Sequence, residues 1–436
     1  MPTLRPLRGL DYALDRFAVP APAGTRIADL TDVVCPPYDV ITPVQQRDLL
    51  ARSERNAVRL ELSTERDPHA AAAAALAAWT ADGTLERRAE GAVYYYRHAR
   101  PLAPDEPTVR GVLAGLLLEP FGAGVRAHEH TLAGPKADRL ALLRATRTQL
   151  SPILAIYFDE SVHYDHAMGL PWTDEWRARD DDGLLHSLAA VEPDGRLLKH
   201  LARQRLYIAD GHHRYETALA YQAEVRSDPR STDAPPGSLS ADWIMVVLVN
   251  AEREELEIMA THRLVLQAPR EALLALVRDP GPGWQAIPVA PTQLGARLAG
   301  MSDSEEPVFG LVLPGEEGYL LIVDANAAEE RMRRERMSTV VRRLDLAILH
   351  TAILEDRLGI TPADIATGGA LAYTRSEADA IRAVASGEAK AAILVRPTRL
   401  EQLAAVAGAG DVMPQKSTYF YPKLLTGLVF YPLEGD

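Results

Sequence analysis

The chain has 436 residues, of which 47% are hydrophobic and 25% charged, and its formal net charge is −13. This length is sufficient for two domains with their own cores, and the composition is that of an ordinary globular protein. The negative charge argues against a general nucleic-acid binder, which normally shows a basic face. The single cysteine, Cys35, excludes an intramolecular disulfide framework and a cysteine-rich metal cluster.

The N-terminal residues 1–6 lack the apolar segment of a secretory signal. The densest apolar run, residues 243–249, is far too short to span a bilayer. We therefore expect a soluble, cytoplasmic protein without a membrane partner. The oligomeric state stays open.

In chain order, the first predicted element is a helix that begins at Thr42, where an N-cap, a proline and a capping-box Gln45 coincide. The alanine-rich run 69–79 predicts a second helix, entered through Asp67 and ended near Gly83. A further helix with an arginine-rich face is predicted at 137–148. Runs rich in β-branched, aromatic and apolar residues predict strands at 91–98, 109–118, 151–157 and 243–250.

Beyond a polar loop at 227–240, the chain again shows strands and helices. We predict two strands within 308–323, an amphipathic helix at 344–358, a strand at 391–395 and a helix at 400–407. Strands and helices alternate irregularly, which favours an α+β (mixed α/β) fold over a doubly wound sheet. The predicted division is 1–265, a catalytic or nucleotide-binding region, and 266–436, whose tail is a candidate to complete the site.

The most informative segment follows the apolar run 206–208 and precedes a helical stretch, which predicts a strand, a tight turn and a helix. Gly211 permits the sharp turn, and Asp210 is expected to cap the helix. Backbone N–H groups of the first turn and the positive end of the helix dipole would then form an anion site. Arg214 would add a bidentate fork, and His212 and His213 would donate hydrogen bonds or transfer protons. The alternative is a capped helix with surface histidines.

A second candidate site is His128-Glu129-His130, followed by Lys136 and Arg139 at the start of a predicted helix. Glu129 would abstract a proton or ligate Mg²⁺, and the two cations would neutralise phosphate charge. A polar loop beside a salt-bridged helix start is the alternative.

Three further features bear on the site. Histidines at 128, 130, 212 and 213, with Asp210 or Glu129, would suit Zn²⁺ or Mn²⁺ if they met in space. Lys416 lies in a segment, 413–423, that is rich in hydroxyls and aromatics but lacks the glycine spacing of a P-loop. This segment is either a phosphate clamp or a packed tail. Thr261-His262-Arg263 is a further candidate for a cationic contact.

Residues 211–216 resemble the nucleotide-phosphate motif of sulfiredoxin, and the ParB proteins and free serine kinases carry related turns on the same fold. The catalytic cysteine of sulfiredoxin would fall at His212, so sulfinic-acid reduction is excluded. Over nearly the whole chain, the sequence also resembles the domain of unknown function 1015 family, which has no assigned reaction. The segments that carry this second resemblance are 36–41, 128–131 with Lys136, Asp138 and Arg139, the turn at 210–216, 261–263 and 413–420.

These resemblances imply a ParB/sulfiredoxin-like nucleotide-binding core with a second α/β region. The leading hypothesis is a phosphotransferase that uses ATP or ADP with Mg²⁺ on a small hydroxyl-bearing metabolite, serine being one candidate. A metal-dependent phosphohydrolase and a non-catalytic ParB-like regulator are the alternatives. In the leading hypothesis the catalytic residues are Glu129, His128, His212 and His213. The metal ligands are Glu129 and Asp210. The nucleotide contacts are Asp210, Gly211, His212, His213, Arg214, Lys136, Arg139 and Lys416.

Overall fold

The computed structural model describes residues 1–101, 103, 107–122, 124–129, 133–161, 172–333 and 337–433. The chain forms two compact units, and each is described by itself. The first unit comprises residues 1–127, 131–256 and 422–436, and the second comprises 128–130 and 257–421. The division after residue 265 stays a prediction. Residues from 422 onward belong to the first unit.

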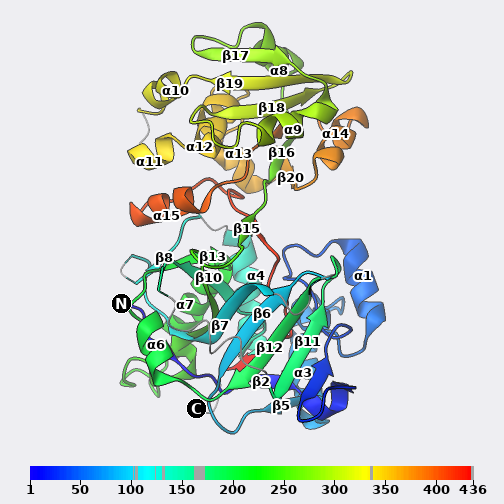
Figure 1. Ribbon diagram of the computed structural model, residues 1–436, viewed down its shortest axis with the longest axis vertical. Coiled ribbons are helices and arrows are strands. Elements are labelled where there is room, and N and C mark those ends of the chain that lie inside the picture. The colour runs from blue at the N-terminus through cyan, green and yellow to red at the C-terminus, as the bar shows by residue number, and fades with distance from the viewer. Residues whose placement is uncertain are drawn as a thin grey trace. The chain divides into compact units, whose positions relative to one another are not determined.

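A mixed sheet forms the centre of the first unit (Figure 1). Parallel pairs, β10–β14, β4–β11 and β8–β13, alternate with antiparallel ones, so the sheet is not doubly wound. The central strand β14 is buried along nearly its whole length, because it lies between β7 and β10 and both faces of the sheet are covered. The strand order is β3 (Ala18–Val19), β4 (Arg26–Asp29), β11 (Asp174–Arg179), β12 (Leu185–Val191), β6 (Val93–Ala99), β7 (Pro107–Leu117), β14 (Trp243–Asn250), β10 (Ile153–Tyr157), β13 (Leu206–Asp210) and β8 (Val125–Arg126), with β1 (Leu4–Arg5) paired to β7.

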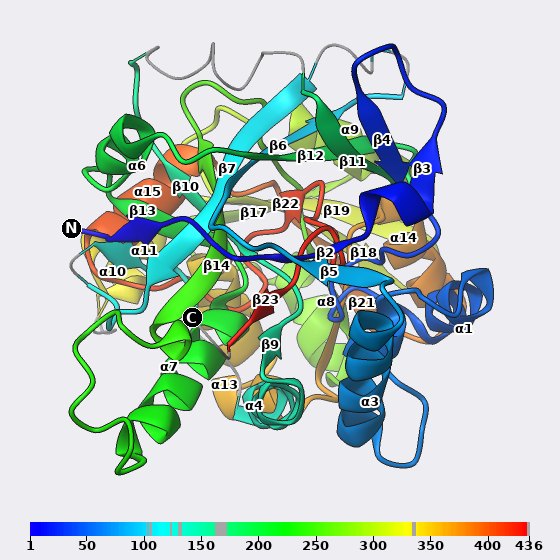
Figure 2. The same cartoon turned by 90° about the horizontal axis from the view of Figure 1, so that it is seen from below.

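Helices pack around this sheet, and α3, α4 and α7 lie side by side (Figure 2). The capping box predicted at Thr42 is confirmed, since its hydroxyl accepts a hydrogen bond from Gln45 N at 3.3 Å. Asp67 likewise caps α3. The helices are α1 (Pro43–Arg52), α2 (Val58–Glu61), α3 (Pro68–Ala81), α4 (Ala133–Thr146), α6 (Gly195–Leu201) and α7 (His212–Ser227), with short 3₁₀ turns η1 (Leu14–Phe17) and η2 (Ser240–Asp242).

The residues after 422 are built into the first unit. β23 (Tyr431–Pro432) pairs with β9 (Thr148–Gln149), and β2 (Leu10–Tyr12) pairs with β5 (Leu85–Arg87) beside it. The backbones of Cys35 and Thr426 exchange hydrogen bonds of 3.1 and 2.8 Å. The first unit therefore depends on this C-terminal segment for its packing.

The second unit contains a six-stranded sheet in which all paired strands are antiparallel. Side chains of α9 and α14 pack on it to form a separate apolar core. The strand order is β17 (Trp284–Pro288), β19 (Glu317–Val323), β18 (Val308–Leu313), β21 (Ala391–Leu394), β16 (His262–Val265) and β20 (Leu371–Thr374), and β15 (Glu257–Ile258) pairs with β22 (Phe420–Tyr421). The helices are α8 (Arg270–Arg278), η3 (Pro291–Gln293), α9 (Leu294–Ala299), α10 (Ala325–Met332), α11 (Thr339–Arg342), α12 (Asp345–Ile348), η4 (Leu349–Glu355), α13 (Pro362–Thr367), α14 (Glu377–Ala385) and α15 (Leu400–Gly408).

The predicted mixed α/β class is confirmed, and each strand predicted from sequence has its counterpart. The helix predicted at 344–358 is wrong in type. Only Asp345–Ile348 is α-helical, and Leu349–Glu355 is a π-helix, with Asp356 N–H donating to the Thr351 carbonyl at 3.1 Å.

Among the described residues, no helix has the length and apolar character needed to cross a membrane.

Candidate functional site

The strand, turn and helix predicted around Gly211 are present. β13 ends at Asp210, Gly211 has a φ of +95°, and α7 begins at His212. A Cβ atom at Gly211 would lie 2.7 Å from Ile153 Cγ2, so both the backbone angle and the close approach require glycine. The first helical hydrogen bond runs from Tyr215 N–H to the Gly211 carbonyl, which places the positive end of the helix dipole at this turn.

Asp210 is not the N-cap that the sequence predicted. Gly211 occupies that position, and no side chain caps the helix. The Asp210 carboxylate instead accepts hydrogen bonds from Arg214 Nη2 and Lys423 Nζ, and the three side chains are only 12–17% exposed. Burial would raise the pKa of Asp210, but the charges of Lys423 and Arg214 hold it well below its ordinary value. Asp210 is therefore a permanent anion between two cations.

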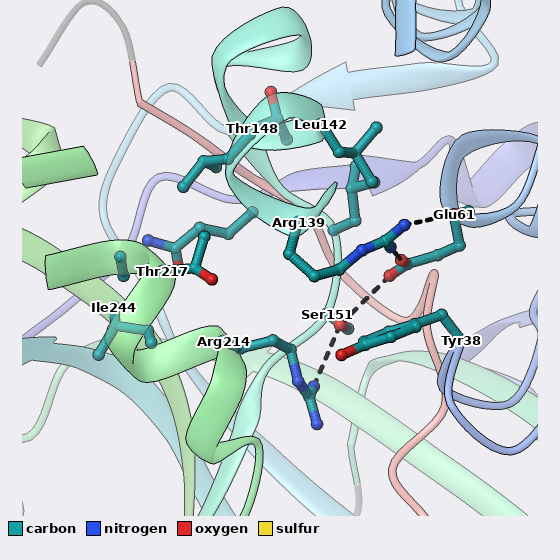
Figure 3. Close-up of a pocket in the computed structure, with 13 residues that line it drawn as sticks. Tyr38, Glu61, Arg139, Leu142, Thr148, Ser151, Arg214, Thr217 and Ile244 are labelled. Atoms are coloured by element: carbon teal, nitrogen blue, oxygen red, sulfur yellow. Dashed lines mark hydrogen bonds and ion pairs between the residues drawn. The ribbon is translucent and has the colours of Figure 1, made fainter. Parts of the chain in front are cut away.

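The contacts of Arg214 continue to a second carboxylate. Its Nη1 donates to Ser151 Oγ at 3.1 Å and also to the Pro152 carbonyl. Ser151 Oγ in turn donates to Glu61 Oε1 at 3.3 Å, and Arg139 Nη1 donates to Glu61 Oε2 at 2.7 Å. Figure 3 shows Ser151 between Arg214 and Glu61. Polar contacts thus connect the two arginines through one hydroxyl and one carboxylate.

Tyr38 contributes an aromatic face to the same group. The Arg139 guanidinium lies 4.3 Å from the centroid of the Tyr38 ring, a cation–π contact. In Figure 3 the ring lies between the two arginines, and its hydroxyl points towards Arg214. Burial raises the pKa of Tyr38 to about 12, so its hydroxyl remains a neutral hydrogen-bond donor. We call Tyr38, Glu61, Arg139, Ser151, Asp210, Arg214 and Lys423 the arginine network.

Five members of the network line a cavity of about 60 Å³, together with apolar side chains that include Leu142 and Ile244. Small-molecule sites usually enclose about 300–1,000 Å³, so this cavity suits one group of a ligand. The network has three cations and two carboxylates, and the neighbouring Asp138 carboxylate accepts hydrogen bonds from Arg139 Nε at 3.0 Å and Nη2 at 2.6 Å. Three carboxylates thus balance the three cations, but the cavity wall itself presents two guanidinium groups, Arg139 and Arg214, and one carboxylate, Glu61. A small anionic group is the ligand that this cavity favours.

The other cations and histidines predicted for this region lie on α4 and α7. Lys136 Nζ donates to Glu216 Oε2 at 2.6 Å, which joins the two helices. His212, which is 7% exposed, and His213 form the first turn of α7. Lys136 thus lies on α4, and the two histidines directly follow Gly211 at the start of α7.

The remaining predicted residues belong to the second unit. Glu129 forms a β-bridge with Met413, and its Oε1 accepts a hydrogen bond of 3.0 Å from Lys416 N. His128 is fully buried, and its Nε2 lies 2.8 Å from Thr418 Oγ1. The structure therefore joins the predicted segments 128–129 and 413–418 to each other. His130 and Thr131 lie outside the described residues.

Arg263, the cation predicted at 261–263, is also in the second unit and is fully buried. Its Nη2 donates to the carbonyls of Gln415 and Lys416 at 3.3 and 3.2 Å. Burial lowers the pKa of Arg263 to about 10. This arginine supports the backbone of the 413–418 segment.

The described residues do not fit the predicted metal ligation. They contain no group of three histidine, cysteine, aspartate or glutamate side chains arranged for a metal ion. Both oxygens of Asp210 accept hydrogen bonds from cations, and such a site repels a divalent ion. Cys35 is buried, and burial raises the pKa of its thiol, so it is not an activated nucleophile.

Several solved structures are similar to this chain. One is a free serine kinase variant in complex with AMP, with a TM-score of 0.37 and 12% identity over 68% of this chain and 83% of that one. Another is a conserved hypothetical protein from Pyrococcus furiosus, with a TM-score of 0.36 and 12% identity over 69% and 89%. A third is SbnI with a C-terminal truncation from Staphylococcus aureus, with a TM-score of 0.36 and 13% identity over 72% and 85%. No curated protein matches the chain.

The comparison with protein families gives one match. Residues 4–347 match a family described as protein of unknown function (DUF1015). This match includes Tyr38, Arg139 and Arg214 of the arginine network as well as His128 and Glu129. The chain belongs to the DUF1015 family.

Proposed function

We propose that the first unit binds the phosphate groups of ATP or ADP at the arginine network, and that the protein transfers a phosphoryl group to a small hydroxyl-bearing metabolite. The observation that carries this proposal is the cavity at the start of α7 with two guanidinium groups, Arg139 and Arg214, in its wall. Guanidinium groups bind phosphate oxygens through paired N–H donors.

The contacts of the network leave donors for such a ligand. Arg214 makes three hydrogen bonds to Ser151, Pro152 and Asp210, out of about five that a guanidinium can donate. The Tyr38 hydroxyl is a neutral donor on the same cavity wall. A bound phosphate would accept hydrogen bonds from these donors beside the two guanidinium groups of the wall.

The chemical step in this proposal is positioning and charge neutralisation, which phosphoryl transfer mainly requires. His212 and His213 stabilise charge on the transferring group, and Lys136 adds a cation. Glu129 as the base for the acceptor hydroxyl and Lys416 as a phosphate contact stay predictions, since both residues belong to the second unit. Serine is the first acceptor to test, because residues 211–216 resemble the turn of the free serine kinases.

The test is calorimetric titration of the full chain with ATP, ADP and inorganic phosphate, in the presence of Mg²⁺. Arg214→Lys keeps the charge beside Asp210 but removes the planar fork, so we expect nucleotide affinity to fall about tenfold or more. Arg144→Lys is the matched control. Arg144 pairs with Glu224 between the same two helices, α4 and α7, but does not line the cavity.

Two results of these titrations would refute parts of the proposal. Wild-type affinity in Arg214→Lys would refute the assignment of the site. Nucleotide binding without production of ADP or AMP in the presence of serine or other hydroxyl acceptors would show a binding protein and refute the transfer step. If circular dichroism shows that Arg214→Lys does not fold, Tyr38→Phe replaces it, since that change removes only one hydroxyl donor.

A further inference from the structure

The second unit contains a larger cavity, distinct from the arginine network. It encloses about 520 Å³, which lies within the range of about 300–1,000 Å³ that is usual for small-molecule sites. Its walls come from α11, the π-helix η4, the start of α13 and residues 411–415. A cavity of this size accepts a whole small ligand.

The chemistry of the walls narrows the class of ligand. Among the described lining residues, the charged side chains are both acidic, Glu355 and Asp411, and no lysine or arginine lines the cavity. Most of the remaining surface is apolar. The apolar lining residues are Met337, Val341, Ala347, Ile360, Pro362, Ile365, Val412, Met413 and Pro414.

Histidine does not alter this charge balance. His350 lines the cavity from the π-helix, and its Nε2 is enclosed without a hydrogen-bond partner among the described residues. Burial, together with the charge of Arg263, lowers the pKa of His350 to about 3, so the imidazole is neutral. On the lining residues that the structure describes, this cavity is therefore negative and apolar.

The walls are fixed by contacts within the second unit. Asp411 Oδ2 accepts a hydrogen bond of 3.0 Å from Ser338 N, which ties residue 411 to the start of α11. Arg263 holds the Gln415 carbonyl. The π-helix supplies His350, Thr351 and Glu355 to the wall, and single π-helical turns often occur at functional sites. A cavity that is formed before the ligand arrives favours specific binding.

We propose that this cavity binds a small organic cation, an ammonium group on an apolar body, with the ammonium directed to Glu355 or Asp411. A carboxylate at the edge of an apolar cavity stabilises such a cation through a charge-assisted hydrogen bond, and the apolar walls bind the rest of the molecule. This inference rests on the second unit alone and does not depend on the proposed phosphoryl transfer.

The test uses three probes of nearly the same shape: phenethylammonium, 2-phenylethanol and phenylacetate. Each is titrated into the full chain by calorimetry. We expect the ammonium probe to bind about tenfold or more tightly than the alcohol, and phenylacetate to bind least. Failure of the ammonium probe to bind, or equal affinity for the ammonium and the alcohol, would overturn the proposal.

Variants then locate the binding. Glu355→Gln and Asp411→Asn remove the two charges, and the asparagine oxygen can still accept the hydrogen bond from Ser338 N. We expect the two changes together to weaken ammonium binding about tenfold. Glu388→Gln, at an exposed position away from the cavity, is the matched control and should bind like the wild type. An equal loss in the control would show non-specific attraction to an acidic chain and overturn the site.

Discussion

Replacement of Asp210 by asparagine is the sharpest test of how the arginine network is held. The change would leave Arg214 and Lys423 beside a neutral amide, where each now donates to a carboxylate oxygen. Loss of one partner from a buried ion pair costs about 3–5 kcal/mol. Because the three side chains are 12–17% exposed, some water reaches them. We therefore expect the free energy of unfolding at pH 7 to fall by about 3 kcal/mol, the lower end of that range.

The pH dependence follows from the lowered pKa of Asp210. The native carboxylate stays ionised below the pKa of about 3.9 that it has in the unfolded chain, because Lys423 and Arg214 outweigh the effect of burial. Its contribution to stability is therefore fully present above pH 4 and is lost as the pH falls towards the native pKa. We expect the difference between wild type and Asp210→Asn to be about 1 kcal/mol smaller at pH 3 than at pH 7.

Urea unfolding followed by circular dichroism measures both quantities. Asp15→Asn is the matched control, because Asp15 pairs with Arg26 at 3.4 Å but the two side chains are 85% and 56% exposed. That variant should unfold like the wild type. If Asp210→Asn were equally stable, or if its difference from wild type did not change between pH 7 and pH 3, the conclusion that two cations hold a buried carboxylate would be refuted.

Two further predictions concern the first turn of α7 and the interior of the large sheet. Gly211→Ala should destabilise the protein by more than ~1 kcal/mol relative to Gly315→Ala, because both glycines have positive φ but only Gly211 would place a Cβ atom against Ile153. Thermal unfolding of the two variants compares them, and equal losses would exclude the steric effect. Burial and the electrostatic effect of His186 lower the pKa of His98 in the folded protein to about 3. In the unfolded chain this histidine has its ordinary pKa of about 6.5, so as the pH falls it is protonated in the unfolded chain first. Wild-type stability should therefore fall about 2 kcal/mol more than that of His98→Gln between pH 7 and pH 5, and parallel urea titration curves would contradict this.

The features that sequence predicted well are local ones. Thr42 and Gln45 cap a helix through contacts within one turn, and the turn at Gly211 follows from the backbone freedom of a single residue. Asp210 shows where local reasoning fails. Aspartate before a helix normally caps it, but here Lys423, which is 213 residues away in the chain, binds the carboxylate.

The cavity beside this turn was predictable only in part. Arg139 and Arg214 were identified from their motifs, whereas Glu61 and Ser151 stand in no motif. They contact Arg139 and Arg214 from 78 and 63 residues away in the chain. The π-helix was missed for a different reason. Its apolar side chains repeat much as in an α-helix. A π-helix differs by hydrogen bonds between residues five apart, and the amino-acid composition does not reveal that spacing.

The return of residues after 422 to the first unit has a consequence for how this protein is made. Lys423 and β23 emerge from the ribosome only after the whole of 257–421, so the network at Asp210 and the pairing of β9 must wait for them. At a synthesis rate of about 5–20 residues per second, this delay is on the order of 10–30 s. During that interval the nascent first unit has Asp210 beside Arg214 without Lys423, and Cys35 without the backbone of Thr426. The first unit can thus complete its fold only after the residues of the second unit have been synthesised.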